Sequence, residues 1–124
     1  MPRRPRLDTA GALHHVIARG IEGAKIFRDK SDYEDFLKRL ADITRDNRIL
    51  VLAWSLIPNH FHLLIRTGKL SLSNAMRKLL TGYAVNFNKR HKRQGHLFQN
   101  RYKSILCEEE PYLLELVRYI HLNP

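Results

Sequence analysis

Two histidines separated by one hydrophobic residue form the first candidate site, in the segment His60-Phe61-His62. Successive side chains of a strand point to opposite faces, so His60 and His62 would share a face while Phe61 points to the other. Two imidazoles at this spacing can bind one divalent cation through neutral ring nitrogens. The same spacing also arises by chance on polar strand faces. The apolar residues on both sides predict a mid-sheet position, where idle polar groups are costly, and this favours metal ligands.

A second candidate site lies near the end of the sequence, in the segment YIHLN that runs from Tyr119 to Asn123. Positions four apart share one face of a helix, so these two side chains would project together. A tyrosine hydroxyl has a pKa of about 10 and attacks well only when a metal or a base draws off its proton. The pair indicates either a nucleophile beside a third metal ligand, Asn123, or a packed tyrosine with asparagine as an ordinary helix cap.

Positive charge is concentrated in the middle of the chain. The net charge is +10, and the segment from Asn47 to Cys107 contains no Asp or Glu. Its basic residues are Arg48, Arg66, Lys69, Arg77, Lys78, Lys89, Arg90, Lys92, Arg93, Arg101 and Lys103. A block of one sign attracts polyanions, and phosphate backbones are the common intracellular polyanion. We therefore favour nucleic-acid binding over a surface that is charged only for solubility.

Length and composition indicate a single domain spanning residues 1–124. The chain has 124 residues, and 44% of them are hydrophobic, which is enough for one core. Apolar runs stay below the roughly 18 residues that span a bilayer, and the basic start lacks the apolar segment of a secretory signal. The single cysteine, Cys107, excludes an internal disulfide and fits a reducing compartment. We expect a cytoplasmic protein.

The first half of the chain predicts a strand, a helix and a hairpin, over residues 13–18, 31–47, 49–57 and 60–66. Ser31 and Glu34 have the spacing of a capping box, in which each side chain satisfies a free backbone N–H group. Pro58 and Asn59 favour a turn between the last two strands, because proline cannot donate to a sheet ladder and asparagine tolerates turn conformations. A single buried helix over 49–66 is the competing interpretation, but Pro58 would break it.

The second half predicts a helix capped by Ser71 or Ser73, a strand over 101–108 and a last helix that opens at 109–111. The apolar stripe of the first of these helices is Leu72, Met76, Leu79, Leu80, Tyr83 and Phe87. Residues 88–94 read as a basic turn or a frayed helix end. The element order predicts an α+β fold, in which a β-α-β-β-α-β core forms a ferredoxin-like or RNA-recognition-type antiparallel sheet with helices packed on one face.

Three segments together resemble the single-tyrosine HUH transposases, especially the REP-associated tyrosine transposase branch. They are MPRRPRLDTAGALHHVIARG at the start, PNHFHLLIR around the histidine pair and GHLFQNRYKSILCEEEPYLLELVRYIHLNP at the end. The resemblance spans essentially the whole chain. The histidine motif alone is short and unspecific, whereas its combination with the late YIHLNP segment and the basic stretch between them is specific.

The resemblance implies a role for each matching residue. His60 and His62 would be the paired metal ligands, with Mg²⁺ or Mn²⁺ as the ion. Tyr119 would attack a DNA phosphodiester, forming a 5′-phosphotyrosine link and freeing a 3′-OH. Asn123 falls where members of the wider group often have Gln, and its shorter side chain makes its ligand role less secure. The partner would be single-stranded or hairpin DNA, in a bacterial, nucleoid-associated protein.

The basic stretch supplies the expected phosphate contacts, namely Arg90, Lys92, Arg93, Arg101 and Lys103. Three alternatives stay open: a replication or mobilisation relaxase, a binding module without catalysis, and a domesticated copy that keeps only the fold. Some relatives dimerise and others act as monomers, and the sequence does not decide between these states. Relatives typically continue beyond the motif helix, whereas this sequence stops at Pro124, so truncation at the C-terminus is also left open.

Overall fold

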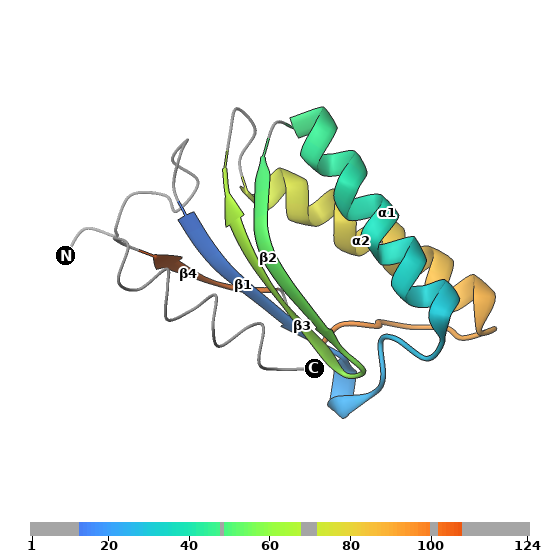
Figure 1. Cartoon of the computed structure of the whole chain (residues 1–124). Helices are drawn as coiled ribbons and strands as arrows, with labels where there is room; N and C mark the ends of the chain where they lie inside the picture. The colour runs from blue at the N-terminus through green and yellow to red at the C-terminus, as the bar shows by residue number, and fades with distance from the viewer. Residues whose placement is uncertain (1–12, 48, 68–71, 100–101, 108–124) are drawn as a thin grey trace.

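The computed structural model describes residues 13–47, 49–67, 72–99 and 102–107, which form one sheet with two helices on one side (Figure 1). The elements in chain order are β1 (Leu13–Arg19), a 3-10 helix η1 (Ile21–Gly23), α1 (Lys30–Asn47), β2 (Leu50–Ile57), β3 (His60–Arg66), α2 (Leu72–Arg90) and β4 (Lys103–Cys107). The sheet is antiparallel with strand order β2-β3-β1-β4. This arrangement confirms the predicted α+β fold of the ferredoxin-like type.

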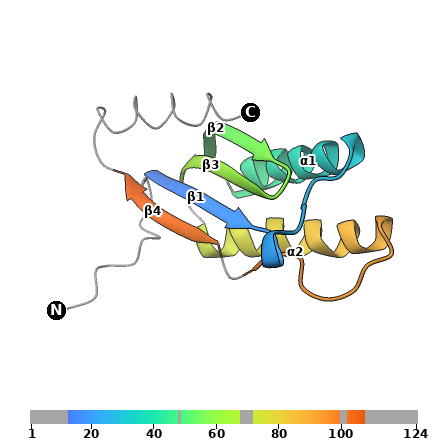
Figure 2. The same cartoon turned by 90° about the horizontal axis from the view of Figure 1, so that it is seen from below.

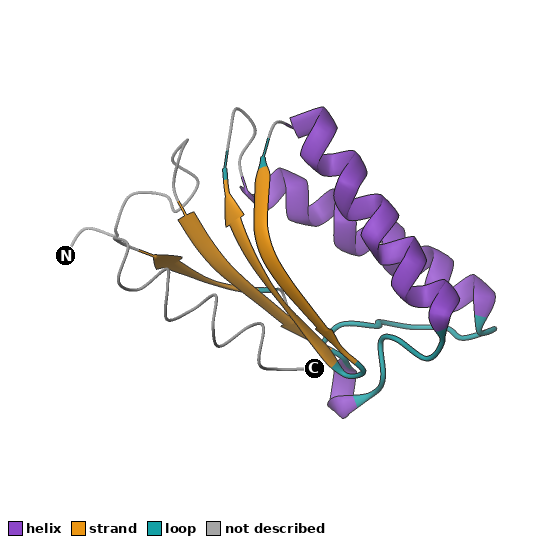
Figure 3. Ribbon diagram, in the orientation of Figure 1, coloured by secondary structure: helices purple, strands orange, loops and turns teal. Residues whose placement is uncertain are grey.

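Strands β1 and β3 lie side by side at the centre of the sheet. Their antiparallel register pairs Leu13 with Arg66 at one end and Arg19 with His60 at the other. Strand β2 pairs with the outer side of β3, and β4 pairs with the outer side of β1, as Figure 3 shows. The histidine strand is therefore hydrogen-bonded on both sides, which confirms the mid-sheet position expected for it.

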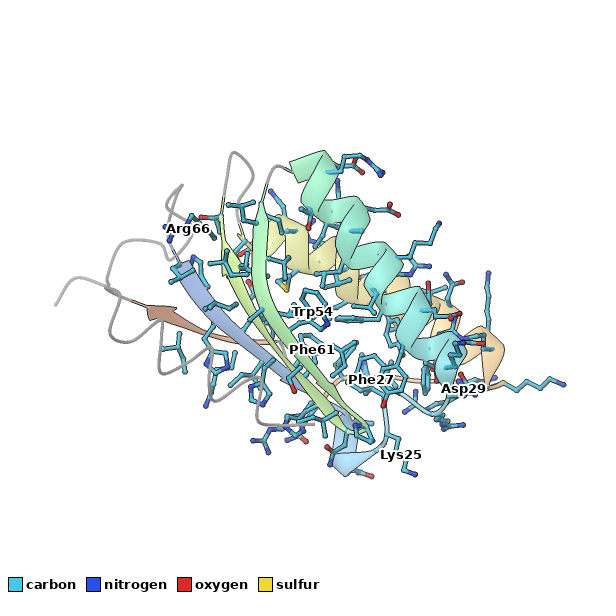
Figure 4. The ribbon with its side chains drawn as sticks, in the orientation of Figure 1. Lys25, Phe27, Asp29, Trp54, Phe61 and Arg66 are labelled. Atoms are coloured by element: carbon cyan, nitrogen blue, oxygen red, sulfur yellow. The ribbon has the colours of Figure 1, made fainter. Side chains whose placement is uncertain are left out.

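The core lies between the sheet and the two helices. Phe61, Leu63 and Ile65 point from β3 toward the helices and are fully buried. Phe61 packs between Phe36 of α1 and Phe98, with its ring centroid 4.9 Å from that of Phe36. Figure 4 shows Phe61 on the helix side of the sheet. The alternation of a strand then requires the residues on either side of Phe61 to face away from this core.

Helix α1 begins one residue earlier than predicted and has a different cap. The helix starts at Lys30, and the carboxylate of Asp29 accepts a hydrogen bond from the N–H of Asp32 at 3.1 Å. The predicted capping box of Ser31 and Glu34 is wrong, because Ser31 already lies inside the helix. Glu34 pairs instead with Lys30 on the surface, at 3.8 Å. Both readings use the same capping chemistry, displaced by two residues.

Helix α2 buries the predicted stripe, including Met76, Tyr83 and Phe87, except for Leu80, which is partly buried. Tyr83 is a core residue, as its helical register suggested: burial raises its pKa, and its hydroxyl donates a hydrogen bond to the backbone carbonyl of Ile26. Ser73 lies inside the helix, so a cap at Ser73 is wrong, while Ser71 lies outside the described residues. The helix continues to Arg90, and a turn follows.

The remaining boundaries differ by one or two residues from those expected. Strand β1 runs one residue further, to Arg19, and β2 begins at Leu50. Strand β4 covers 103–107 within the predicted 101–108. The helix predicted from 109 onward lies outside the described residues. None of the helices in the described part of the chain is both long and apolar enough to cross a membrane.

Candidate active site

The face of the sheet turned away from the helices carries the histidine pair. In the β1–β3 ladder, His60 lies opposite Arg19 and His62 lies opposite Ile17. His15, two residues before Ile17, shares this face. In the view of Figure 2, α1 and α2 both lie on one side of β1 and β3. The structure therefore brings three imidazoles and one guanidinium to the same face of the two central strands.

The three imidazoles lie in direct contact. The ring centroids of His60 and His62 are 5.0 Å apart, at an interplanar angle of 75°. The rings of His15 and His62 stack with centroids 5.2 Å apart, and a hydrogen bond of 3.0 Å joins His15 Nε2 to His62 Nδ1. His15 and His62 are buried, at 5% and 4% exposure, whereas His60 is half-buried. His60 and His62 thus share a face as predicted.

The surroundings keep these imidazoles uncharged. Burial, the largest cause, and the neighbouring His15, His60 and Arg19 together lower the pKa of His62 to about 4. Burial and the charge of Arg19 also lower the pKa of His60. Burial lowers the pKa of His15. A neutral imidazole retains the lone pair that a metal ion requires, so these shifts favour metal binding near neutral pH.

The turn that precedes His60 is held by backbone hydrogen bonds from the segment after β1. The N–H of Gly20 donates to the carbonyl of Asn59 at 2.9 Å, and the carbonyl of Pro58 accepts from the N–H groups of Ile26 and Phe27. A Cβ atom at position 20 would lie 2.0 Å from the carbonyl oxygen of Ala24, so only glycine permits this approach. These contacts fix the turn that directly precedes His60, the first candidate ligand, in the sequence.

Asn59 also contacts that ligand through its side chain. Its Oδ1 lies 2.8 Å from Nδ1 of His60. Because a carbonyl oxygen can only accept, His60 must carry its proton on Nδ1 and keep the lone pair of Nε2. His60 therefore meets the usual requirement of a metal-binding histidine, whose second nitrogen is bonded to a partner that sets its tautomer.

One predicted phosphate contact, Lys103, lies on the same face as the histidines. It is exposed on β4 and pairs with Ile17, which pairs in turn with His62 on the other side. Exposed Arg19 lies opposite His60 on this face. The face thus carries positive charge beside the histidine pair. Tyr119, Asn123 and Arg101 lie outside the described residues.

Three other predicted contacts lie at the far end of α2, where two of them have partners within the chain. Nε of Arg90 donates to Asp32 at 2.8 Å, and Nη1 donates to Asp35 at 3.0 Å, so its guanidinium joins the two helices. Arg93 donates to Asn88 and to the carbonyls of Gly95 and His96, which closes the turn after α2. Lys92 is exposed. Arg90 and Arg93 therefore have structural roles that charge counting alone did not indicate.

A second group of potential metal ligands lies beside Arg90, in the described part of the chain. One ligand atom each from Asp29, Asp32 and His91 lies within 4.8 Å of the others. Burial raises the pKa of Asp32, but hydrogen bonds from the Arg28 N–H, His91 and Arg90 outweigh it, and the net pKa is lowered. A guanidinium already neutralises this carboxylate, so we interpret the group as an ion pair between helices rather than a cation site.

Sequence reasoning missed two residues that contact the histidine pair, His15 and Asn59. His14 and His15 are adjacent on β1, so only one of them can face the pair. The structure turns His15 toward His62, whereas His14 faces the helices and lies 3.0 Å from the hydroxyl of Ser104. The available signal was the strand register, because β1 must place either its odd or its even residues on that face.

The comparison with protein families decides the identity. A family model for IS200-like transposases matches residues 9–123, nearly the whole chain. The chain belongs to the IS200-like transposase family. This confirms the family inferred from the sequence motifs, and a transposase function follows from it.

Two solved structures share the fold of this transposase. One is a REP-associated tyrosine transposase bound to a REP hairpin, with a TM-score of 0.76 and 17% identity over 100% of this chain and 73% of that one. The other is a candidate transposase from Deinococcus radiodurans R1, with a TM-score of 0.64 and 19% identity over 98% of this chain and 97% of that one. No curated protein matches the transposase.

Proposed function

We propose that this chain is a metal-dependent, single-tyrosine HUH transposase that cleaves and rejoins single-stranded or hairpin-tipped DNA. The observation that carries the proposal is the pairing of His60 and His62 on one sheet face, uncharged and with ring centroids 5.0 Å apart. Family membership supports DNA strand transfer as the reaction class. The proposed nucleophile is Tyr119, and the proposed third ligand is Asn123.

The residues present fit a divalent cation. His60 offers Nε2 because its Nδ1 is bonded to Asn59. His62 has its Nδ1 bonded to His15, and its lowered pKa keeps it available as a neutral ligand. When bound, Mg²⁺ or Mn²⁺ would polarise a phosphoryl oxygen and stabilise the charge that develops there. Mn²⁺ suits imidazole ligands better than Mg²⁺ does, and Zn²⁺ could bind without supporting turnover.

The proposed reaction exchanges one phosphodiester for another. The hydroxyl oxygen of Tyr119 attacks phosphorus, the bond from phosphorus to the 3′ oxygen breaks, and a 5′-phosphotyrosine forms. The proton lost by the phenol is balanced by the proton gained at the 3′-OH. Because the covalent link conserves the energy of the phosphodiester, a different 3′-OH can attack it and rejoin the strand without a nucleotide cofactor.

The proposed DNA surface is the histidine face and the basic residues around it. Lys103 and Arg19 are exposed there and would contact backbone phosphates, as would Arg101. Lys92, exposed in the turn after α2, is a separate proposed phosphate contact away from this face. The related REP-associated tyrosine transposase was solved with a REP hairpin, which supports a hairpin substrate for this chain. Arg90 and Arg93 are omitted from the proposed phosphate contacts because their guanidinium groups bond within the chain.

The test is an adduct assay on single-stranded and hairpin DNA with Mn²⁺, using strands labelled at either end. We expect the 3′-labelled fragment to migrate with the protein and the 5′-labelled fragment to leave with a free 3′-OH. EDTA and Tyr119→Phe should each abolish the adduct. Tyr33→Phe, on α1 behind the sheet, is the matched tyrosine control and should keep it. Tight binding without any adduct would contradict the proposal and favour a binding module or a domesticated copy.

A further inference from the structure

Both candidate ligands are hydrogen-bonded through the same ring nitrogen. Nδ1 of His60 meets Oδ1 of Asn59 at 2.8 Å, and Nδ1 of His62 meets Nε2 of His15 at 3.0 Å. The two partners come from different places, the hairpin turn and the neighbouring central strand. For His60 the chemistry of the partner settles the tautomer, because an amide oxygen accepts and cannot donate. For His62 the partner is another imidazole, so two arrangements must be compared.

In the first arrangement, Nδ1–H of His62 donates to Nε2 of His15. His62 then keeps the lone pair on its own Nε2, as His60 does. In the second, Nε2–H of His15 donates to Nδ1 of His62, and neutral His62 must then carry its proton on Nε2. That proton would occupy the position through which His62 could bind a metal ion. Metal binding by both histidines through the same nitrogen therefore requires the first arrangement.

The packing around His15 suits the role of a fixed acceptor. Its ring is buried and stacks on that of His62, with centroids 5.2 Å apart and planes 26° apart. It lies on β1, whose ladder with β3 runs unbroken from Leu13 to Arg19. Neither ring can rotate away without disturbing a buried contact at the sheet centre. A group held in this way can orient a neighbouring ligand without touching the metal ion.

We propose that His15 is a positioning residue that accepts the Nδ1 proton of His62 and so commits His62 to binding metal through Nε2. Asn59 does the same for His60. The role of His15 deepens the proposed function and rests on it only for the identity of the metal ligands. The tautomer of His62 in the metal-free protein can be measured whether or not the chain cleaves DNA.

The first measurement is the tautomer of His62 by two-bond ¹H–¹⁵N correlation in the metal-free protein at neutral pH. We expect a proton on Nδ1 in the wild type. His15→Phe keeps a stacked ring of similar size but removes the acceptor, so His62 should shift toward the Nε2–H form. His15→Gln keeps an oxygen that accepts and should retain the Nδ1–H form. A wild-type His62 protonated on Nε2 would overturn the proposal.

The second measurement is Mn²⁺ affinity by calorimetry on the same variants. Loss of the partner that orients a ligand typically weakens metal binding about 10- to 100-fold, which we expect for His15→Phe. His15→Gln should bind close to the wild type, and His14→Gln, on the opposite face of the same strand, controls for any buried histidine on β1. If His15→Gln lost as much affinity as His15→Phe while His62 kept its tautomer, His15 would be a direct ligand and the positioning role would be wrong.

The failure of the proposed catalysis can be distinguished from the failure of the positioning role. Normal tautomers and normal Mn²⁺ affinity in a chain that forms no DNA adduct would refute the proposed catalysis alone.

Discussion

Nε of Arg90, at the last residue of α2, donates a hydrogen bond to Oδ1 of Asp32 in the first turn of α1 at 2.8 Å. The Asp32 side chain is fully buried, and Arg90 also bonds to Asp35. The pair joins the end of one helix to the start of the other on the side of the sheet opposite the histidines. Its contribution should therefore appear in stability rather than in metal or DNA binding.

Asp32→Asn should destabilise the protein by about 2–3 kcal/mol, because it weakens the charge-assisted hydrogen bonds that the buried carboxylate accepts from the Arg28 N–H and from Arg90. Chemical denaturation at pH 7 measures the change. Asp42→Asn is the matched control: Asp42 pairs with Arg45 on the exposed surface of α1, and its loss should cost less than about 1 kcal/mol. Equal effects of the two variants would show that the buried pair has no special role.

The stability of the metal-free protein should fall as the pH falls from about 6.5 to about 4. The pKa of His62 is lowered from 6.5 to about 4, mainly by burial. Burial also lowers the pKa values of His15 and His60. In this window the unfolded chain binds more protons than the folded one, so acid favours unfolding. The slope is about 1.4 kcal/mol per pH unit for each proton of difference.

Denaturation series between pH 7 and pH 4.5 would measure this slope. His62→Phe removes the most strongly shifted group and should flatten the curve. The pKa of Asp32 is lowered from its usual value of 3.8, so this group changes its protonation state below the pH range of the series. It therefore does not contribute to the slope. A wild-type curve that is flat across the range would contradict the buried, neutral state of the three histidines.

Lys103 should contact a DNA phosphate. Lys103→Gln is expected to lower the slope of log affinity against log salt by about 1, because one fewer counterion is released on binding. Lys38→Gln makes the same charge change at an exposed position on α1, behind the sheet, and should leave the slope unchanged. Fluorescence anisotropy with hairpin DNA over a salt series gives both slopes, and identical slopes for the two variants would remove Lys103 from the DNA surface.

Gly20→Ala should destabilise the turn that precedes the histidine pair. The added Cβ would lie 2.0 Å from the carbonyl oxygen of Ala24, and a backbone atom cannot move aside as a side chain can. Overpacking of this kind costs about 1–3 kcal/mol. Because Gly20 donates to Asn59, Mn²⁺ affinity should fall as well.

Gly82→Ala is the control for that substitution. Its Cβ would meet only the guanidinium end of Arg39, at 2.4 Å, and this flexible group can shift. Alanine is favoured over glycine within a helix by up to about 1 kcal/mol, so the variant should be close to the wild type or more stable. Thermal unfolding of both variants tests the contrast, and a Gly82→Ala variant as unstable as Gly20→Ala would refute the explanation by backbone contact.

The sequence was sufficient for the order of elements and for the shared face of His60 and His62, because both depend on local periodicity. It was insufficient wherever two distant segments meet. The orientation of His15 depends on how β1 aligns with β3, and the ion pair of Arg90 depends on where α2 ends relative to α1. The helix cap at Asp29 was missed for a different reason: several residues nearby can cap, and propensity alone does not choose among them.

The pairing of β1 with β3 also has a consequence for the order in which the molecule assembles. The β2–β3 hairpin is local in sequence and brings His60 and His62 together by itself. His15 lies 47 positions from His62 and arrives only when the ends of a long loop have closed. A chain that had formed only the hairpin would display both histidines with the proton of His62 free to occupy either nitrogen. Metal binding at full affinity would then begin only after the long-range pairing of β1 with β3 had formed, so the protein would acquire its ion late in folding.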